Sequence, residues 1–200
     1  MSKGRLEAFS DGVIAIIITI MVLELRPPEG TAVGDLFPVV PAFSIYALSF
    51  ALLGIYWANH HHLLQAARTV DGLALWANLH LLFWLSLVPF GTAWVGDSGF
   101  ASVPVAIYGA VLLLAAIAYY GLVRALIRVP GQTDAIAIAV GRDTKGKVSP
   151  LLYALAIPVA LLAPWLAMAI YLFVAVMWIV PDRRMERALA AHASGRAASA

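Results

Sequence analysis

Cysteine is absent from this sequence, and charged residues are scarce. None of the 200 residues is cysteine, and only 12% are Asp, Glu, Lys or Arg. Without cysteine, neither a disulfide framework nor a thiolate metal site is possible. Soluble domains carry about 25% charged residues, so the scarcity of charge argues against a soluble domain.

What the sequence does contain is apolar residues, which make up 62% of the chain. A membrane-spanning helix needs about 20 of them, so the length allows five or six spans and little else. The net charge of +2 is small, and the basic residues lie in short loops beside apolar runs. We therefore expect a lipid bilayer as the environment and no nucleic-acid partner.

The apolar runs predict an all-α, polytopic integral membrane protein with six transmembrane helices. We expect the helices to form one domain over 1–182, followed by a basic cytoplasmic tail over 183–200. The expected spans are 7–25, 38–64, 73–95, 103–127, 150–163 and 165–180. Pro89 predicts a kink in the third span. The last apolar stretch is long for one helix and short for two, and Ala163-Pro164-Trp165 is typical of a tight turn in its middle. The alternative is a single kinked helix and five spans.

The positions of the basic residues favour six spans. In that topology 12 of the 13 Lys and Arg residues lie on the inner side, and Arg26 is the one outside. Cytoplasmic loops carry this excess of positive charge. Five spans would place the Arg183, Arg184 and Arg187 cluster outside. We expect a multi-pass protein of the cell membrane with both termini in the cytoplasm.

A compact polar motif precedes the first apolar run. It consists of Arg5, Phe9, Ser10 and Asp11 in the pattern R-x-x-x-F-S-D. Charged groups so close to hydrocarbon are energetically expensive and usually functional. An unpaired buried acid costs several kcal/mol, so a partner for Asp11 is expected.

The first span carries one stripe of branched residues and a single hydroxyl. Ile16, Thr19, Ile20 and Leu23 fall on one face about 100° wide, opposite Asp11. On periodicity alone, the commoner outcome is a lipid-facing or packing surface whose threonine bonds to its own backbone. The other outcome is the wall of an ion path.

The second and third predicted spans carry a polar cluster near the cytoplasmic side. It contains Trp57, Asn59, His60, His61, His62, Asn78 and His80. Three adjacent histidines on a helix point about 100° apart, so they cannot converge on one metal ion. A site made of His60, His80 and Asp11 is a less favoured alternative, because a catalytic metal needs more converging ligands and an open position. We expect no metal and no cofactor.

The motif from Arg5 to Asp11 resembles that of the transmembrane protein 175 family, potassium channels of endosomes and lysosomes with shorter prokaryotic homologues. Trp57-x-x-His60 and Asn78-x-His80 are also similar to the family pattern. The resemblance implies a potassium-permeable channel rather than an enzyme, built from four identical subunits. It also implies that the first helix lines the pore.

The resemblance also implies a role for each residue of the stripe on the first span. Ile16, Ile20 and Leu23 correspond to a hydrophobic constriction, and Thr19 corresponds to a hydroxyl layer that confers selectivity. An aliphatic ring narrow enough to expel water gates by dewetting. No Thr-Val-Gly-Tyr-Gly filter occurs in the sequence, so we expect a non-standard channel with a modest potassium preference. Glu24 would form an acidic ring at the outer mouth, or else is a solvated surface carboxylate.

The resemblance also assigns the motif to a structural network that fixes the first helix. Its expected members are Arg5, Phe9, Ser10 and Asp11, with partners from the second and third helices among Trp57, His60, His61, Asn78 and His80.

Two other function classes remain open. A proton-coupled secondary transporter is favoured by the histidines and Asp11, which could relay protons, but the sequence lacks the inverted repeats and paired broken helices of such transporters. A metal-dependent membrane enzyme ranks third, because the ligand set is poor.

Overall fold

The computed structural model describes residues 2–131, 136 and 144–179, and these residues form helices and no strands. The prediction of an all-α chain is confirmed. In chain order the helices are α1 Lys3–Leu23, the 3₁₀ helix η1 Val33–Val39, α2 Val40–Ala66, α3 Gly72–Ser86, α4 Val88–Asp97, α5 Ser102–Ile127, α7 Thr144–Leu162 and α8 Pro164–Ile179. The expected tail over 183–200 lies outside these residues.

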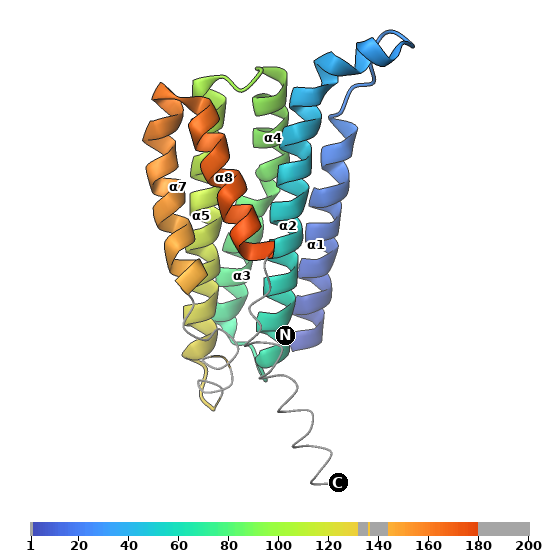
Figure 1. Ribbon diagram of the computed structural model, residues 1–200. Helices are drawn as coiled ribbons and strands as arrows, with labels where there is room; N and C mark the ends of the chain where they lie inside the picture. The colour runs from blue at the N-terminus through green and yellow to red at the C-terminus, as the bar shows by residue number, and fades with distance from the viewer. Residues whose placement is uncertain (1, 132–135, 137–143, 180–200) are drawn as a thin grey trace, which may run out of the picture.

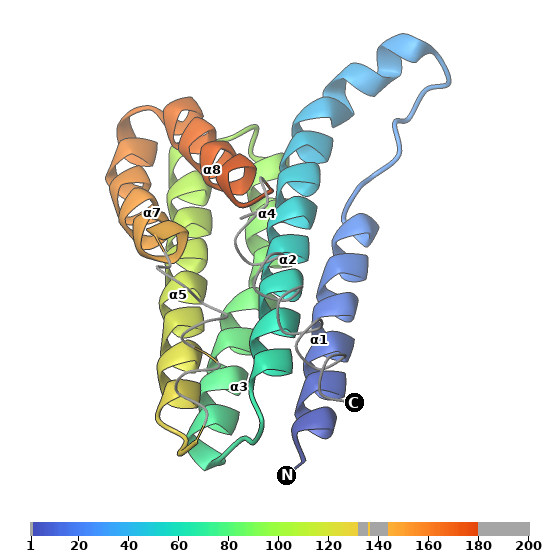
Figure 2. The same cartoon turned by 60° about the horizontal axis from the view of Figure 1, so that its bottom comes forward.

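The helices form one bundle of roughly parallel and antiparallel rods (Figure 1). Helix α5 packs against α3 and α7, while α2 packs against α4 and α8. Helix α1 contacts α2, α3 and α4, and it stands at one edge of the bundle (Figure 2). One side of α1 is therefore not covered by the other helices that the structure describes.

The third apolar run is broken into two helices. Helix α3 ends at Ser86 and α4 begins at Val88, with Pro89 in its first turn. Proline has no N–H to donate to the preceding turn and its ring clashes there, so the kink lies at the position the sequence predicted. The break allows α3 to pack on α5 while α4 packs on α2.

Helices α7 and α8 meet at Ala163, and Pro164 begins α8. Helix α7 begins at Thr144, earlier than the expected start at residue 150, and includes Pro150 and Pro158. The added turns are held against α8, because the Trp178 indole N–H donates to Ser149 Oγ at 2.9 Å.

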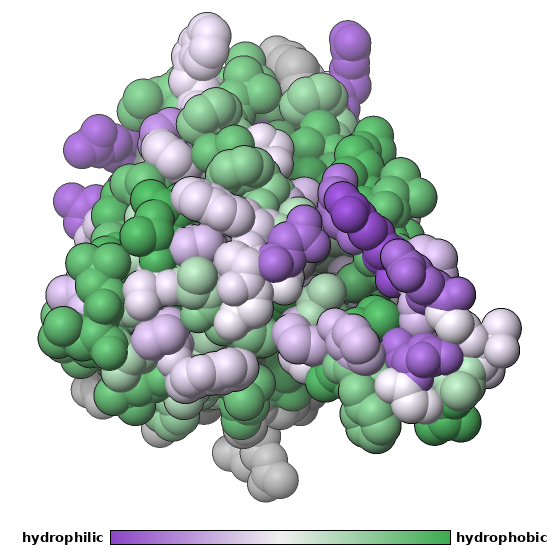
Figure 3. Space-filling model, turned by 90° about the horizontal axis from the view of Figure 1, so that it is seen from above, coloured by the Kyte–Doolittle hydropathy of each residue, from purple (hydrophilic) through white to green (hydrophobic). Residues whose placement is uncertain are grey.

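The outer surface of the bundle is suited to lipid. Among the described residues, five helical segments are long and apolar enough to cross a membrane, the third of them including the break between α3 and α4: Lys3–Leu23, Val33–Ala66, Gly72–Asp97, Ser102–Ile127 and Thr144–Leu162. The sixth, Pro164–Ile179, is shorter. Seen from above, hydrophilic side chains gather mainly from the centre to the right of the face, others lie at its left and upper edges, and most of the remaining surface is apolar (Figure 3). The chain is a multi-pass membrane protein.

Candidate functional site

Helix α1 has one face packed in the bundle and another face open. Its buried residues are Leu6, Ser10, Ile14, Ile17 and Met21. These recur every three or four positions, so they form a single stripe against α2, α3 and α4. The predicted pore stripe lies on the other side of the helix.

The predicted constriction residues are exposed in the single chain. The exposed fractions are 58% for Ile16, 41% for Ile20 and 78% for Leu23. Leucine and isoleucine are among the residues most often buried in proteins, so this uncovered row is available to lipid, to another subunit or to a pore.

Thr19 lies on the same open face, and its hydroxyl hydrogen is engaged with the helix backbone. Thr19 Oγ1 donates towards the carbonyl oxygens of Ala15 and Ile16, each 3.0 Å away. This is the backbone bonding that periodicity alone suggested. A hydroxyl oxygen that donates in this way keeps its lone pairs, and these remain available on the exposed side. Glu24, the residue that ends α1, is also exposed.

A buried chain of hydrogen bonds connects the motif to two other helices. Asn78 Nδ2 on α3 donates to Ser10 Oγ at 2.9 Å, and Ser10 Oγ donates to Leu6 O at 2.8 Å. Asn78 Oδ1 lies 2.7 Å from His60 Nε2 on α2. The side chains of Ser10, His60 and Asn78 are fully buried, so this chain fixes α1 against both helices.

The amide of Asn78 determines the proton position on His60. Its oxygen can only accept, so His60 Nε2 carries the hydrogen and donates it. His60 Nδ1 is buried and has no hydrogen-bond partner among the described residues.

Two further contacts tie successive turns of α1 to successive turns of α2. Trp57 Nε1 donates to Asp11 Oδ1 at 3.0 Å. One turn away, His61 Nδ1 lies 3.3 Å from Glu7 Oε1. Gln65 Nε2 donates to His61 Nε2 at 2.8 Å, so in neutral His61 the hydrogen is on Nδ1, the atom that faces Glu7.

Three residues expected in the network lie outside it. Arg5 is exposed and makes no hydrogen bond or ion pair with any described residue, and Phe9 is exposed on α1. Arg5 lies seven residues before Gly12, and Phe9 lies seven residues before Ile16. Seven residues make about two helical turns, so Arg5 and Phe9 lie on the same open face as Gly12 and Ile16. His80 accepts from Trp84 Nε1 at 3.2 Å within α3. It lies two positions from Asn78, on nearly the opposite face of the helix.

The sequence analysis missed Glu7 and a second polar cluster. Glu7 lies four residues before Asp11, so both face α2, and that spacing was the available signal. In the second cluster, Ser49 Oγ lies 2.7 Å from Thr92 Oγ1 and 2.8 Å from the Tyr108 hydroxyl. All three side chains are buried and join α2, α4 and α5. Isolated hydroxyls inside apolar runs could have indicated them.

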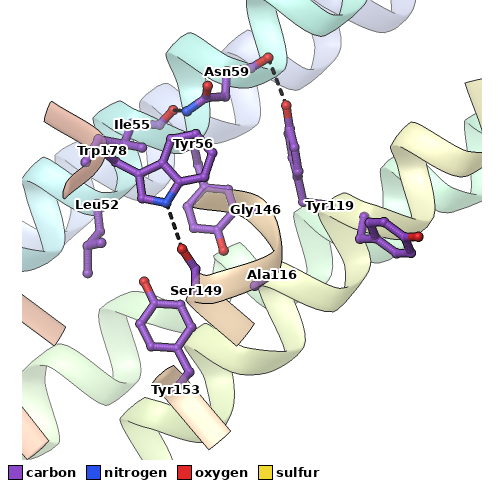
Figure 4. Close-up of a pocket in the computed structure, with 11 residues that line it drawn as sticks. Leu52, Ile55, Tyr56, Asn59, Ala116, Tyr119, Gly146, Ser149, Tyr153 and Trp178 are labelled. Atoms are coloured by element: carbon purple, nitrogen blue, oxygen red, sulfur yellow. Dashed lines mark hydrogen bonds between the residues drawn. The ribbon is translucent and has the colours of Figure 1, made fainter. Parts of the chain in front are cut away.

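A cavity lies between α2, α5, α7 and α8, away from the open face of α1 (Figure 4). Tyr56 and Tyr153 border it, and its wall includes the hydrogen bond from Trp178 to Ser149. Tyr119 donates to Asn59 O at 3.2 Å beside it. All of the residues that line this cavity belong to one subunit, so it differs from a path that several copies of α1 would form.

No group of three His, Asp or Glu residues arranged to hold a metal ion occurs in the described part of the chain. The alternative site of His60, His80 and Asp11 is not assembled there, because His60 and His80 are engaged with Asn78 and Trp84 respectively.

Comparison with known proteins gives one family. The family model described as "Endosomal/lysosomal potassium channel TMEM175" matches residues 5–89. A protein of Chryseobacterium sp. (strain P1-3) named "Potassium channel HX13_20290" is 51% identical over 189 residues, which cover 94% of this chain and 98% of that protein. The human "Endosomal/lysosomal proton channel TMEM175" is 35% identical over 96 residues, 42% of this chain and 19% of the human protein.

Among solved structures, the chain is similar to that of a lysosomal potassium-selective channel TMEM175 homolog from Chamaesiphon minutus. The TM-score is 0.78 at 28% sequence identity, and the match covers 89% of this chain and 96% of the other. The similarity therefore extends well beyond the motif and includes most of the bundle.

Proposed function

This chain belongs to the TMEM175 family of potassium channels, and we propose that it is a potassium-permeable channel in which α1 of several identical subunits lines the pore. The family and its relatives are channels and not enzymes. The proposal concerns which residues form the ion path and how many subunits surround it.

One observation carries the proposal: the open face of α1 presents aliphatic side chains and one hydroxyl. Ile16 and Leu23 are more than half exposed, with Thr19 between them. The opposite face is fixed in the bundle by buried residues and by the link from Ser10 to Asn78. The bundle thus holds α1 with this face outward, as a pore-lining helix requires.

One helix cannot enclose a path, so several copies must surround an axis. Closed cyclic symmetry is the usual arrangement of identical subunits, and we propose four. The connection after α1 supports contact between copies. Helix η1 projects beyond the bundle (Figure 2), and its Val33 and Phe37 are 80% and 74% exposed. Covering these side chains with a neighbouring subunit removes apolar surface from water.

In this arrangement Ile16, Ile20 and Leu23 form successive aliphatic rings. Rings narrow enough to exclude water block ions, and a small widening restores conduction. The lone pairs of Thr19 face the ion because its hydrogen is bonded to the backbone. Glu24 from each copy would form an acidic ring that concentrates cations at the outer mouth.

The contacts of the motif have a structural role in this proposal. Ser10 and Asp11 fix the rotation of α1, since each bonds to a side chain on another helix. Arg5 and Phe9 lie on the open face, so their partners would come from a neighbouring subunit. We place the protein in the cell membrane with both termini in the cytoplasm, as the distribution of basic residues indicates.

Proton permeation is the second candidate, because the human relative is named a proton channel. Titratable side chains do lie at the contact of α1 and α2, where Glu7 meets His61. That contact is not on the stripe of Ile16 and Thr19, so the geometry favours potassium along the open face.

A proton-coupled transporter is a different alternative, and flux measurements distinguish it from a channel. Its flux would saturate with substrate and depend steeply on a proton gradient.

The test is potassium flux from liposomes containing purified protein. Ile16→Asn should raise the flux, because a polar ring stays wetted. Val22→Asn is the control, since Val22 is exposed on the same helix but off the stripe. If the two substitutions change the potassium flux equally, or if Ile16→Asn does not change it, the proposal that α1 lines the pore is contradicted.

A further inference from the structure

An open groove lies between α3 and α5. It is at the end of the bundle where α3 begins and α5 ends, and Figure 2 shows these two helix ends side by side. It has a volume of about 360 Å³. Each helix contributes a single stripe to it, with Leu73, Ala77 and His80 on α3 and Ile117, Gly121, Arg124 and Arg128 among the residues on α5. The spacing of three or four in each set means that two helix faces oppose each other across the groove.

The groove is hollow because several of its lining residues are small. Ala77 and Gly121 are among them, together with Ala118 and Ala125. A Cβ atom added at Gly121 would meet nothing within 4 Å. A membrane contains no water to fill an apolar groove, so lipid occupies such a space when protein does not.

Two guanidinium groups lie at the end of the groove. Arg124 Nη1 donates to the Tyr120 hydroxyl at 3.1 Å, and its guanidinium lies 5.7 Å from the centre of the same ring. Arg128 is exposed and makes no ion pair or hydrogen bond within the described part of the chain. Asp71, which lies at this end of α3, accepts from the Ala74 N–H as a helix cap. Within the described residues, this carboxylate forms no ion pair with Arg124 or Arg128.

A histidine side chain lies deeper in the groove. His80 Nε2 accepts from Trp84, so in the neutral ring the hydrogen is on Nδ1. His80 is exposed and lies seven residues further along α3 than Leu73, about 10 Å from that end. The groove thus presents cations at its mouth, one donor further in, and apolar walls beyond.

We propose that this groove binds one anionic phospholipid. Arg124 and Arg128 hold the phosphate, His80 donates to an ester carbonyl, and the lipid passes over Ala77 and Gly121 so that its acyl chain continues along Ile117. Guanidinium groups suit phosphate geometry, and basic pockets between transmembrane helices on the cytoplasmic side are suited to anionic head groups. A zwitterionic lipid fits less well, because its quaternary amine would approach the same two arginines.

The test is native mass spectrometry of the full-length protein in detergent, titrated with dioleoyl phosphatidylglycerol or dioleoyl phosphatidylcholine. Phosphatidylglycerol should bind more tightly. Each arginine near an anionic lipid contributes about fivefold, so Arg124→Gln with Arg128→Gln should weaken binding roughly twenty-five-fold. Arg26→Gln, at the opposite end of the bundle, removes the same charge and should leave binding unchanged.

A second variant tests the groove itself. Gly121→Leu places a bulky side chain in the groove at a position where the added Cβ meets nothing within 4 Å, and it should also weaken phosphatidylglycerol binding severalfold with the arginines intact. Equal binding of the two lipids, or unchanged binding in the double arginine variant, would overturn the proposal. An effect of the arginines with none from Gly121→Leu would also overturn it, because it would indicate general surface attraction. Binding is measured without ion flux, so the result is independent of the proposed channel function.

Discussion

The Trp57 indole donates a hydrogen bond to the Asp11 carboxylate across 3.0 Å. The same indole stacks on His61, with ring centroids 5.9 Å apart and planes inclined by 22°. His61 in turn faces Glu7 at 3.3 Å. These contacts connect two turns of α1 to two turns of α2, and together with Asn78 they set the rotation of the helix that we place at the pore.

Trp57→Phe removes the donor and keeps an aromatic ring beside His61. We expect a loss of stability of about 1 kcal/mol, the net value of an ordinary hydrogen bond, measured by thermal unfolding of the purified protein in detergent. Trp76→Phe is the matched control, since Trp76 is 71% exposed on α3. Similar melting temperatures for the two variants would show that the indole hydrogen bond contributes nothing.

Asn78→Leu tests the buried link between three helices. Ser10 keeps its bond to the Leu6 carbonyl, but the His60 Nε2–H is left buried without an acceptor. An unsatisfied buried donor costs about 1–3 kcal/mol, so the variant should melt earlier and assemble poorly. The control is Ser86→Ala, which removes a hydroxyl bonded to Phe83 O on the surface of the same helix. A wild-type melting temperature for Asn78→Leu would contradict the role of this link.

Thr19→Ala removes the hydroxyl oxygen from the proposed ion path. We expect the potassium over sodium permeability ratio to fall severalfold, because no other hydroxyl of the stripe replaces lost hydration. The ratio is obtained from reversal potentials in planar bilayers. Thr19→Ser retains the oxygen and should keep most of the preference. If the alanine and serine variants are equally selective, the selectivity originates elsewhere.

Gly109 tests packing inside the subunit. A Cβ there would collide with the Tyr171 hydroxyl, which donates to Val105 O at 3.2 Å. Gly109→Ala should therefore destabilise the bundle by about 1–3 kcal/mol, as overpacking does. Gly121→Ala is the control, since its Cβ meets nothing within 4 Å and alanine favours the helix. The reverse order of melting temperatures would contradict the packing of α8 on α5.

The sequence was sufficient to predict the helical class, the family and the break at Pro89, because each depends on local residues. These predictions use the apolar runs, Pro89 and the motif from Arg5 to Asp11. None of them requires knowing which helices are neighbours. Partners for Ser10 and Asp11 on the second and third helices were expected from the resemblance, and in the structure Asn78 bonds to Ser10 and Trp57 to Asp11.

Which side chains of α1 and α2 contact each other depends on the rotation of one helix against the other. That rotation could not be predicted from the sequence. His61 meets Glu7 rather than Ser10, and Arg5 lies on the open face of α1, because the buried stripe from Leu6 to Met21 fixes that rotation. His80 and Asn78 lie on nearly opposite faces of α3, as helical geometry requires for residues two positions apart. The similarity of Asn78-x-His80 to the family pattern nevertheless led us to expect both residues in one network.

The most direct test of the pore uses the absence of cysteine from the chain. Single cysteines are introduced at Thr19, Leu23 and Val22, and potassium current is recorded as a thiol-reactive cation is applied. Our account predicts irreversible block at Thr19→Cys and Leu23→Cys, slowed by high potassium, and no block at Val22→Cys. Unimpaired current after complete labelling at Thr19 and Leu23 would contradict it.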